Sequence, residues 1–194
     1  MIVVIDYRTG NIRSVMNALR RLGCDAELTS DPVRILSADH VILPGVGDCS
    51  EAMRNLRESG LSDVIRKISS PVLGICVGMQ LMCRRSEEGG TEGLGIFPTD
   101  VVRFVPEPGL KIPHMGWNSI SNLKSELFNG VDEGSYVYYV HSYYPVMCDC
   151  AIATSIHGTE FCGALKWNNF YGCQFHPEKS SSVGTTIIEN FLKL

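Results

Sequence analysis

The sequence has no excess of positive charge and no long apolar segment, and each absence excludes a class of protein. Its 17 lysines and arginines stand against 21 aspartates and glutamates, a net charge of −4 with neutral histidine, which argues against a nucleic-acid partner. No run approaches the roughly 18 apolar residues of a membrane-spanning helix. The first six residues lack the basic and long apolar parts of a secretory signal. We therefore expect a cytoplasmic protein that binds neither nucleic acid nor membrane.

The eight cysteines lack the spacing of a disulfide framework or a zinc site. They are mostly scattered singly over 194 residues, and a chain of this length builds enough core to fold without covalent cross-links. The one close pair, Cys148-Asp149-Cys150, has no second pair at zinc-ligand spacing. We expect reduced thiols, no metal and a loop or edge position for this segment.

The chain also lacks internal repeats, low-complexity tracts and any linker long enough to divide it. Hydrophobic residues make up 44% and charged residues 20% of the sequence, as in folded globular domains. We expect residues 1–194 to form a single domain.

The first half of the chain alternates between apolar runs and segments with helical spacing. Four runs have the character of buried strands: residues 2–5, the weaker 26–29, 40–43 and 72–75. Residues 6–11 carry turn-forming side chains, and helical spacing follows at 12–22, before Gly23, and at 51–58. This alternation predicts a parallel sheet covered by helices on both faces.

After residue 97 the pattern changes to short strand-like segments separated by glycine, proline and asparagine. The segments are 101–105, 136–140, 151–155, 161–166 and 171–175, and they favour antiparallel pairing. Val183, Ile187, Ile188 and Phe191 have the spacing of a closing helix. We expect the two halves to share one sheet.

The segment Gly74-Ile75-Cys76-Val77-Gly78 overlaps the end of the 72–75 strand and precedes a helix-like stretch. Small residues beside Cys76 suit the sharp strand-to-helix turn that exposes a nucleophile at the carboxyl end of a strand. The first N–H groups of a following helix favour a thiolate and a developing oxyanion. On this motif alone, Cys76 is equally well explained as a core thiol between two packing glycines.

A nucleophilic thiol needs a base, and the candidates are His40, His114, His141, His157 and His176. His176 ends a strand-like run in the sequence Gln-Phe-His-Pro-Glu, and its i, i+2 spacing places Glu178 on the same side of an extended backbone. A carboxylate there can fix the imidazole tautomer whose other nitrogen deprotonates Cys76. Alone, His-Pro-Glu is more typical of a surface turn. Beside a strand-tip cysteine, it makes His176 the preferred base.

A second loop of small residues, Pro44-Gly45-Val46-Gly47, follows the strand at 40–43. A doubly wound sheet would bring this loop to the same edge as Cys76, where its glycines could aim a peptide N–H at an oxyanion. The alternative is a plain strand-to-helix turn. The loop lacks the Gly-Lys-Ser/Thr ending of a phosphate loop, so we do not expect nucleotide binding.

These motifs together resemble the class I glutamine amidotransferases, and within them the glutaminase subunits of imidazole glycerol phosphate synthases. The resemblance covers essentially the whole chain. Its narrower part rests on Asp6-Tyr7 with Gly10-Asn11, Pro44-Gly45-Val46-Gly47, Pro113-His114-Met115-Gly116-Trp117-Asn118 and Tyr139-Val140-His141-Ser142-Tyr143-Tyr144. It implies a flavodoxin-like α/β fold: a mostly parallel sheet with helices on both faces and an antiparallel extension in the C-terminal half.

The resemblance also implies an activity: hydrolysis of glutamine to glutamate and ammonia through a cysteine thioester, without a cofactor. Cys76 would be the nucleophile, His176 the base and Glu178 its orienting acid. The backbone at Val46 and Val77 would form the oxyanion hole, although the family pattern suggests leucine in place of Val77. The implied glutamine-binding residues are Gly47, Gln80, Glu88, His141, Ser142 and Tyr143.

The implied partner is a cyclase subunit of the (β/α)₈ barrel type, joined to the glutaminase as a heterodimer. The cyclase would use the ammonia to form imidazole glycerol phosphate and aminoimidazole carboxamide ribotide in histidine biosynthesis, and the glutaminase would be nearly silent without it. The implied interface residues are Pro113, His114, Trp117, Asn118, Tyr138 and Lys179. Lys179 is otherwise explained as a solvated charge after a turn.

Two other functions stay open at this point. The glutaminase of pyridoxal phosphate synthase should carry a Gly-Gly-Glu-Ser type of loop where this chain has Pro44-Gly45-Val46-Gly47. A non-enzymatic, redox-sensing member of the same fold would keep a reactive cysteine without an acid–base pair, which His176 and Glu178 disfavour.

Overall fold

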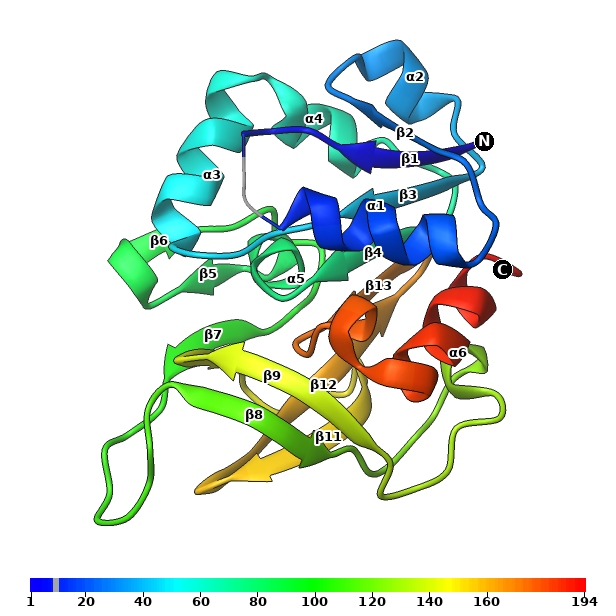
Figure 1. Cartoon of the computed structure of the whole chain (residues 1–194). Coiled ribbons are helices and arrows are strands. Elements are labelled where there is room, and N and C mark those ends of the chain that lie inside the picture. Colours follow the sequence, from blue (N-terminus) through cyan, green and yellow to red (C-terminus); the bar gives the residue numbers. More distant parts are fainter. Residues whose placement is uncertain (9–10) are drawn as a thin grey trace.

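The computed structural model describes residues 1–8 and 11–194 of the chain (Figure 1). Thr9 and Gly10, part of the expected 6–11 turn, lie outside the described residues. The apolar runs of the first half form strands where the sequence predicted them. These are β1 (Ile2–Ile5), β2 (Ala26–Thr29), β3 (His40–Leu43) and β4 (Val72–Ile75).

The main sheet has seven strands in the order β11-β12-β13-β4-β3-β1-β2. Its second-half members are β11 (Ala151–His157), β12 (Thr159–Trp167) and β13 (Phe170–Cys173). The strands β13, β4, β3, β1 and β2 are parallel, and β12 and β11 extend them in antiparallel fashion. The parallel part has the flavodoxin-like order, so its strands end at one common edge, where ligands bind in such sheets.

Four helices occupy predicted positions: α1 (Ile12–Arg21), α3 (Cys49–Glu58), α5 (Val77–Met82) and α6 (Ser181–Phe191). In Figure 1, α1 and α6 lie in front of the sheet, and α3 contacts α5 and α4 (Leu61–Arg66). Gly23 follows α1 with φ at 72°, the left-handed conformation expected of a helix-ending glycine. No helix within residues 1–8 and 11–194 is both long and apolar enough to span a membrane.

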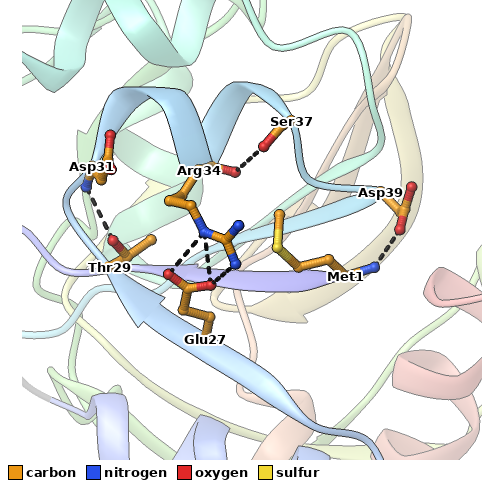
Figure 2. Close-up of polar contacts among 7 residues, drawn as sticks. All are labelled: Met1, Glu27, Thr29, Asp31, Arg34, Ser37 and Asp39. Carbon is orange, nitrogen blue, oxygen red and sulfur yellow. Dashed lines mark hydrogen bonds and ion pairs between the residues drawn. The ribbon is translucent and has the colours of Figure 1, made fainter.

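The short helix α2 (Pro32–Leu36), which the sequence did not indicate, is fastened to the edge strand β2 by polar contacts (Figure 2). The Arg34 guanidinium forms an ion pair with Glu27 on β2. The Asp31 N–H donates to Thr29 Oγ1 over 3.1 Å, and the Asp31 carboxylate caps α2 by accepting from the Val33 N–H. These exposed contacts set the turn after β2 and add little stability individually.

The expectation that the two halves share one sheet is confirmed for β11, β12 and β13, but the other second-half strands lie outside the main sheet. A separate four-stranded sheet consists of β10 (Tyr143–Pro145), β7 (Asp100–Arg103), β5 (Arg85–Ser86) and β6 (Thr91–Glu92). A two-stranded ribbon consists of β8 (His114–Ser119) and β9 (Tyr136–His141). The ribbon buries one face: Tyr139 shares a 2.7 Å hydrogen bond with Ser155 on β11. It is a separate layer because it packs over the sheet's face instead of pairing at its edge.

A short 3₁₀ turn, η3 (Pro177–Lys179), is held between the ribbon and α6. The His176 N–H donates to the Tyr138 carbonyl of β9 over 2.9 Å, and the Ser180 hydroxyl donates to the His176 carbonyl over 2.6 Å. On α6, Gly184 approaches the turn so closely that a Cβ there would lie 1.9 Å from the Pro177 carbonyl oxygen. The contact between α6 and η3 therefore fixes the backbone on which His176 and Glu178 stand.

Replacing Gly184 with alanine should destabilise the protein, although alanine is the better helix former. The gain in helix propensity is about 1 kcal/mol, whereas a clash with a backbone oxygen forces α6 or η3 to move and costs about 3 kcal/mol. We expect urea denaturation to show a net loss of about 2 kcal/mol. The control Ser182→Ala, at an exposed position on the same helix, should change stability by less than about 0.5 kcal/mol. A Gly184→Ala protein as stable as the parent would refute the close packing.

Candidate active site

Cys76 stands at the strained turn between β4 and α5. Its φ is 53° and its ψ is −111°, a backbone conformation that side-chain-bearing residues seldom adopt and that clusters at functional sites. Its N–H donates to the Cys173 carbonyl of the neighbouring strand over 2.7 Å, and its carbonyl accepts the first bonds of α5, from Met79 and Gln80. The turn is thus held from both sides.

The small residues beside Cys76 are required by packing. A Cβ on Gly78 would lie 2.0 Å from the Leu43 carbonyl oxygen, and one on Gly74 would lie 2.8 Å from the Met79 nitrogen. This spacing lets α5 begin directly against the end of β3.

A cavity of about 270 Å³ opens at Cys76. Its lining residues are Val46, Gly47, Cys76, Val77, Gln80, Glu88, Pro113, Val140, His141, Ser142 and Tyr143. The cavity therefore brings together the residues that the sequence assigned to the oxyanion hole and to glutamine, from both halves of the chain. Among these lining residues there is one carboxylate, Glu88, and no lysine or arginine. The thiol of Cys76 thus faces a cavity, which a purely structural core thiol would not require.

His176 and Glu178 form a buried hydrogen-bonded pair: His176 Nδ1 lies 2.8 Å from Glu178 Oε1. The expected extended backbone is wrong, because Pro177 starts the η3 turn and this turn brings the carboxylate to the ring. Burial opposes protonation of His176, but its interactions with Cys76 and Glu178 prevail and raise the pKa of the imidazole. For Glu178, burial favours the neutral acid and would raise the pKa, but hydrogen bonds from His176 and Asn11 lower it.

Asn11 is a site residue to which the sequence gave no role. Its Nδ2 donates to Glu178 Oε1 and lies 3.4 Å from His176 Nδ1. Its φ of 69° is in the left-handed region, which asparagine tolerates better than most residues. The signal that could have found it is an asparagine beside glycine just after a strand, a position suited to that conformation.

The loop at 44–47 lies directly against the start of α5, as predicted from the strand order. A Cβ on Gly45 would lie 2.5 Å from the Gly78 nitrogen, and the Tyr7 hydroxyl donates to the Pro44 carbonyl over 2.6 Å. Val46 lines the cavity, and Gly47 has φ at 90°, which a side chain would strain. Val46 and Val77 therefore border the same cavity as Cys76.

Glu88 is held by its contact with α3. Its Oε2 accepts from the Cys49 N–H over 2.8 Å. Burial raises the pKa of the Glu88 carboxyl, and the hydrogen bond from Cys49 works in the opposite direction. One carboxylate oxygen is thereby fixed while the side chain still borders the cavity.

His141, which lines the cavity, forms a buried pair with His114. Their Nε2 and Nδ1 atoms are 2.9 Å apart, and His141 Nδ1 lies 2.8 Å from the Tyr143 carbonyl oxygen. Burial lowers the pKa of His141 to about 3 and that of His114 to about 4, the latter with a contribution from His157. Both rings are therefore neutral near pH 7.

The residues expected at a partner interface fall into two groups. Trp117 is 53% exposed, Pro113 and Lys179 are also exposed, and Tyr138 and Asn118 are half-buried. His114 is only 5% exposed, so its side chain does not reach the surface that Trp117 occupies. The reason is its place on β8: its ring points inward, onto His141 and Tyr139.

The remaining cysteines do not approach the cavity as lining residues. All eight thiols are free, and residues 148–150 lie in a turn region, as the sequence favoured. The Sγ atoms of Cys148 and Cys162 are 4.0 Å apart.

Comparisons with known proteins agree with this fold. A family model described as "Glutamine amidotransferase class-I" matches residues 3–194. The "Imidazole glycerol phosphate synthase subunit HisH" of Bacteroides fragilis is 53% identical over 194 residues, covering 100% of this chain and 99% of that protein. The HisH subunit of Vibrio vulnificus, numbered HisH 1 in one strain, is 43% identical over 200 residues, with 100% and 98% covered.

Solved structures show the same fold at low sequence identity. A crystal structure described as a glutamine amidotransferase is 18% identical with a TM-score of 0.76, covering 100% of this chain and 98% of that one. A chain of PurLQS from Thermotoga maritima is 17% identical with a TM-score of 0.73, covering 99% and 97%. With the family match over residues 3–194 and the full-length relatives, the chain belongs to the class I glutamine amidotransferases, in the family of the imidazole glycerol phosphate synthase subunit HisH.

Proposed function

We propose that this protein is the glutaminase subunit of an imidazole glycerol phosphate synthase and serves histidine biosynthesis. The observation that carries the proposal is the arrangement of three residues. Cys76 stands on a strained strand-to-helix turn and lines a cavity, and the buried His176–Glu178 pair follows the neighbouring strand β13. The HisH relatives, matched over their whole length, support the choice of synthase.

The reaction follows from this arrangement. Cys76 attacks the side-chain carboxamide of glutamine while His176 accepts the thiol proton. The C–N bond then breaks, and His176 gives the proton to the departing ammonia. Water hydrolyses the resulting glutamyl thioester to glutamate and restores the thiol. Glu178, held by Asn11, keeps the Nδ1 proton of His176 in place, so that Nε2 is the nitrogen that exchanges protons.

The tetrahedral intermediates carry a negative oxygen, for which we propose the backbone N–H groups at Val46 and Val77. Val77 is the first residue of α5, and the helix's own first bonds come from Met79 and Gln80, so the Val77 N–H is not used within the helix. Val46 borders the same cavity from the loop at 44–47. Removing one such donor typically slows acyl transfer about 10²- to 10³-fold.

The cavity's charge suits the substrate's α-amino end. Glu88 is the carboxylate among its lining residues and can pair with the ammonium of glutamine. Because no lysine or arginine is among those residues, the substrate carboxylate needs backbone and hydroxyl donors, which we assign to Gly47, Ser142 and Tyr143. Gln80 and His141 complete the wall.

We propose that the cyclase subunit docks on the outer face of the β8–β9 ribbon. Met115, Trp117 and Tyr136 on this face are 63%, 53% and 60% exposed, and such a concentration of apolar side chains is typical of a protein interface. Trp117 and Tyr138 pair across the ribbon with their rings 6.1 Å apart. Pro113 and Lys179 border this face, and His114 and Asn118 support it from inside, where Asn118 Nδ2 lies 3.2 Å from His114 Nε2.

We further propose that residues 1–194 act as one glutamine amidotransferase domain in the cytoplasm. The free thiols are compatible with a reducing compartment. The relatives argue against a pyridoxal phosphate synthase subunit, because the two described above carry the imidazole glycerol phosphate synthase name. The His176–Glu178 pair argues against a purely redox-sensing role.

Replacing Cys76 with serine should abolish glutamine hydrolysis, because a serine hydroxyl at this position is a far weaker nucleophile than the thiol. The complex with the cyclase should still form product when ammonium salt replaces glutamine, since the cyclase site is untouched. Both rates are measured as product formation by the purified complex. Cys24→Ser, which changes a half-buried thiol on another part of the surface, is the matched control and should keep both activities. Near-normal glutamine use by Cys76→Ser would overturn the nucleophile assignment.

Replacing Glu178 with glutamine should move the basic limb of the pH–rate profile to lower pH. The carboxylate helps to raise the pKa of His176, so the proton that the ring takes from Cys76 stays available to the departing ammonia up to higher pH. Without the charge this pKa falls, so the acid form is lost earlier as pH rises. The profile of kcat/KM for glutamine measures the shift, and an unchanged basic limb in Glu178→Gln would contradict the assignment. His176→Asn should be more severe, losing about 10²- to 10⁴-fold at every pH.

A further inference from the structure

A buried glutamine, Gln174, lies against the reactive sulfur. It follows β13 and is 0% exposed. Its Nε2 is 3.7 Å from Cys76 Sγ, within hydrogen-bond reach of a sulfur acceptor, and its Oε1 accepts from Gln80 Nε2 over 2.9 Å. The mechanism above gives Gln174 no role, although it touches the atom that forms the thioester.

The direction of this contact is fixed by a backbone carbonyl. Gln80 Nε2 also donates to the Tyr143 carbonyl over 3.0 Å, and a carbonyl oxygen can only accept. Gln80 therefore has to turn its amide nitrogen toward Tyr143. That same nitrogen meets Gln174, so Gln174 has to offer its oxygen there and its N–H to Cys76. Turning either amide over would place two acceptors or two donors in contact.

We propose that Gln174 is a hydrogen-bond donor that stabilises negative charge on Cys76 Sγ in both halves of the reaction; the proposal rests on the glutaminase function above. In acylation, the N–H stabilises the thiolate from which the new C–S bond forms. In hydrolysis of the thioester, the C–S bond breaks and its electron pair returns to sulfur. The same N–H then donates a hydrogen bond to the negative sulfur. Burial strengthens this contact, because Gln174 is 0% exposed and water does not compete for its amide.

Other groups also act on this sulfur and stay constant in the test. His176 faces it from the loop after β13 with Glu178 behind, Cys49 interacts with it from α3, and Glu88 borders the same cavity. The test therefore compares variants that differ only at Gln174.

The first variant is Gln174→Met, which keeps the length of the side chain and removes its N–H. The rate of Cys76 alkylation by iodoacetamide is measured against pH in the glutaminase–cyclase complex, with the Cys76 peptide followed by mass spectrometry. Losing a hydrogen bond to a charged sulfur should raise the midpoint of this curve by about one pH unit and lower kcat/KM for glutamine about tenfold. The matched control is Asn190→Leu, which removes another buried amide, bonded to Leu127 and Asn129, and should leave the midpoint unchanged.

The second variant, Gln174→Glu, keeps the support of Gln80 and reverses the polarity of the group beside the sulfur. Glutamate still offers an oxygen to Gln80 but places an acceptor and negative charge beside the sulfur, so its midpoint should rise more than that of Gln174→Met. If Gln174 only props Gln80, Gln174→Met would lower kcat/KM without moving the midpoint of Cys76 alkylation, and that pattern overturns the proposal. An unchanged midpoint in either folded variant overturns it too, and if one variant does not fold the other decides. Failure of the unmodified complex to hydrolyse glutamine would instead refute the proposed function.

Discussion

The site depends on the contact between the start of α5 and the end of β3. A Cβ on Gly78 would lie only 2.0 Å from the Leu43 carbonyl oxygen, so only glycine permits this approach. The close packing brings the loop at 44–47 and the first peptides of α5 together beside Cys76. The strained φ of 53° at Cys76 persists because the bond from its N–H to the Cys173 carbonyl and the packing of α5 leave the turn no alternative.

The second half of the chain supplies the chemistry that the first half cannot. The nucleophile belongs to the parallel sheet, but His176, Glu178 and Gln174 follow β13, and the opposite cavity wall comes from residues 140–143. Hydrogen bonds across this boundary join Asn11 to Glu178 and Gln80 to both Gln174 and the Tyr143 carbonyl. Glu178, Gln80 and Gln174 are thereby oriented by partners from other elements, which suits a site that must hold its geometry through two chemical steps.

The strands β1, β3 and β4 could be predicted to the residue, because buried parallel strands are continuous apolar runs. The strand β13 was expected at 171–175 and spans Phe170–Cys173. The short helices α2 and α4 could not, since five or six residues carry little periodicity. The strand β8 could not either: His-Met-Gly-Trp-Asn-Ser shows no apolar alternation, and its pairing with β9 is set by tertiary packing. The same absence explains why the inward position of His114 was not predicted, because a strand that is not recognised has no predictable inner face.

At the site, Cys76 and the His-Pro-Glu segment could be recognised from their local sequence spacing. Gln174 and Asn11 did not, because their partners are 98 and 167 residues away in the sequence. Such contacts exist only once the strand order is known. The i, i+2 spacing also predicted an extended backbone between His176 and Glu178, whereas Pro177 starts a 3₁₀ turn there.

Every step of the proposed reaction depends on Cys76 being the thiol that attacks glutamine. The most direct measurement is covalent labelling of the glutaminase–cyclase complex with a glutamine analogue that carries an electrophile at the side-chain carbonyl position, with every cysteine peptide examined by mass spectrometry. We expect one adduct per chain, on Cys76, with the other seven thiols unmodified. Excess glutamine should protect Cys76 from labelling. An adduct on another cysteine, or labelling of Cys76 that glutamine does not slow, would contradict it.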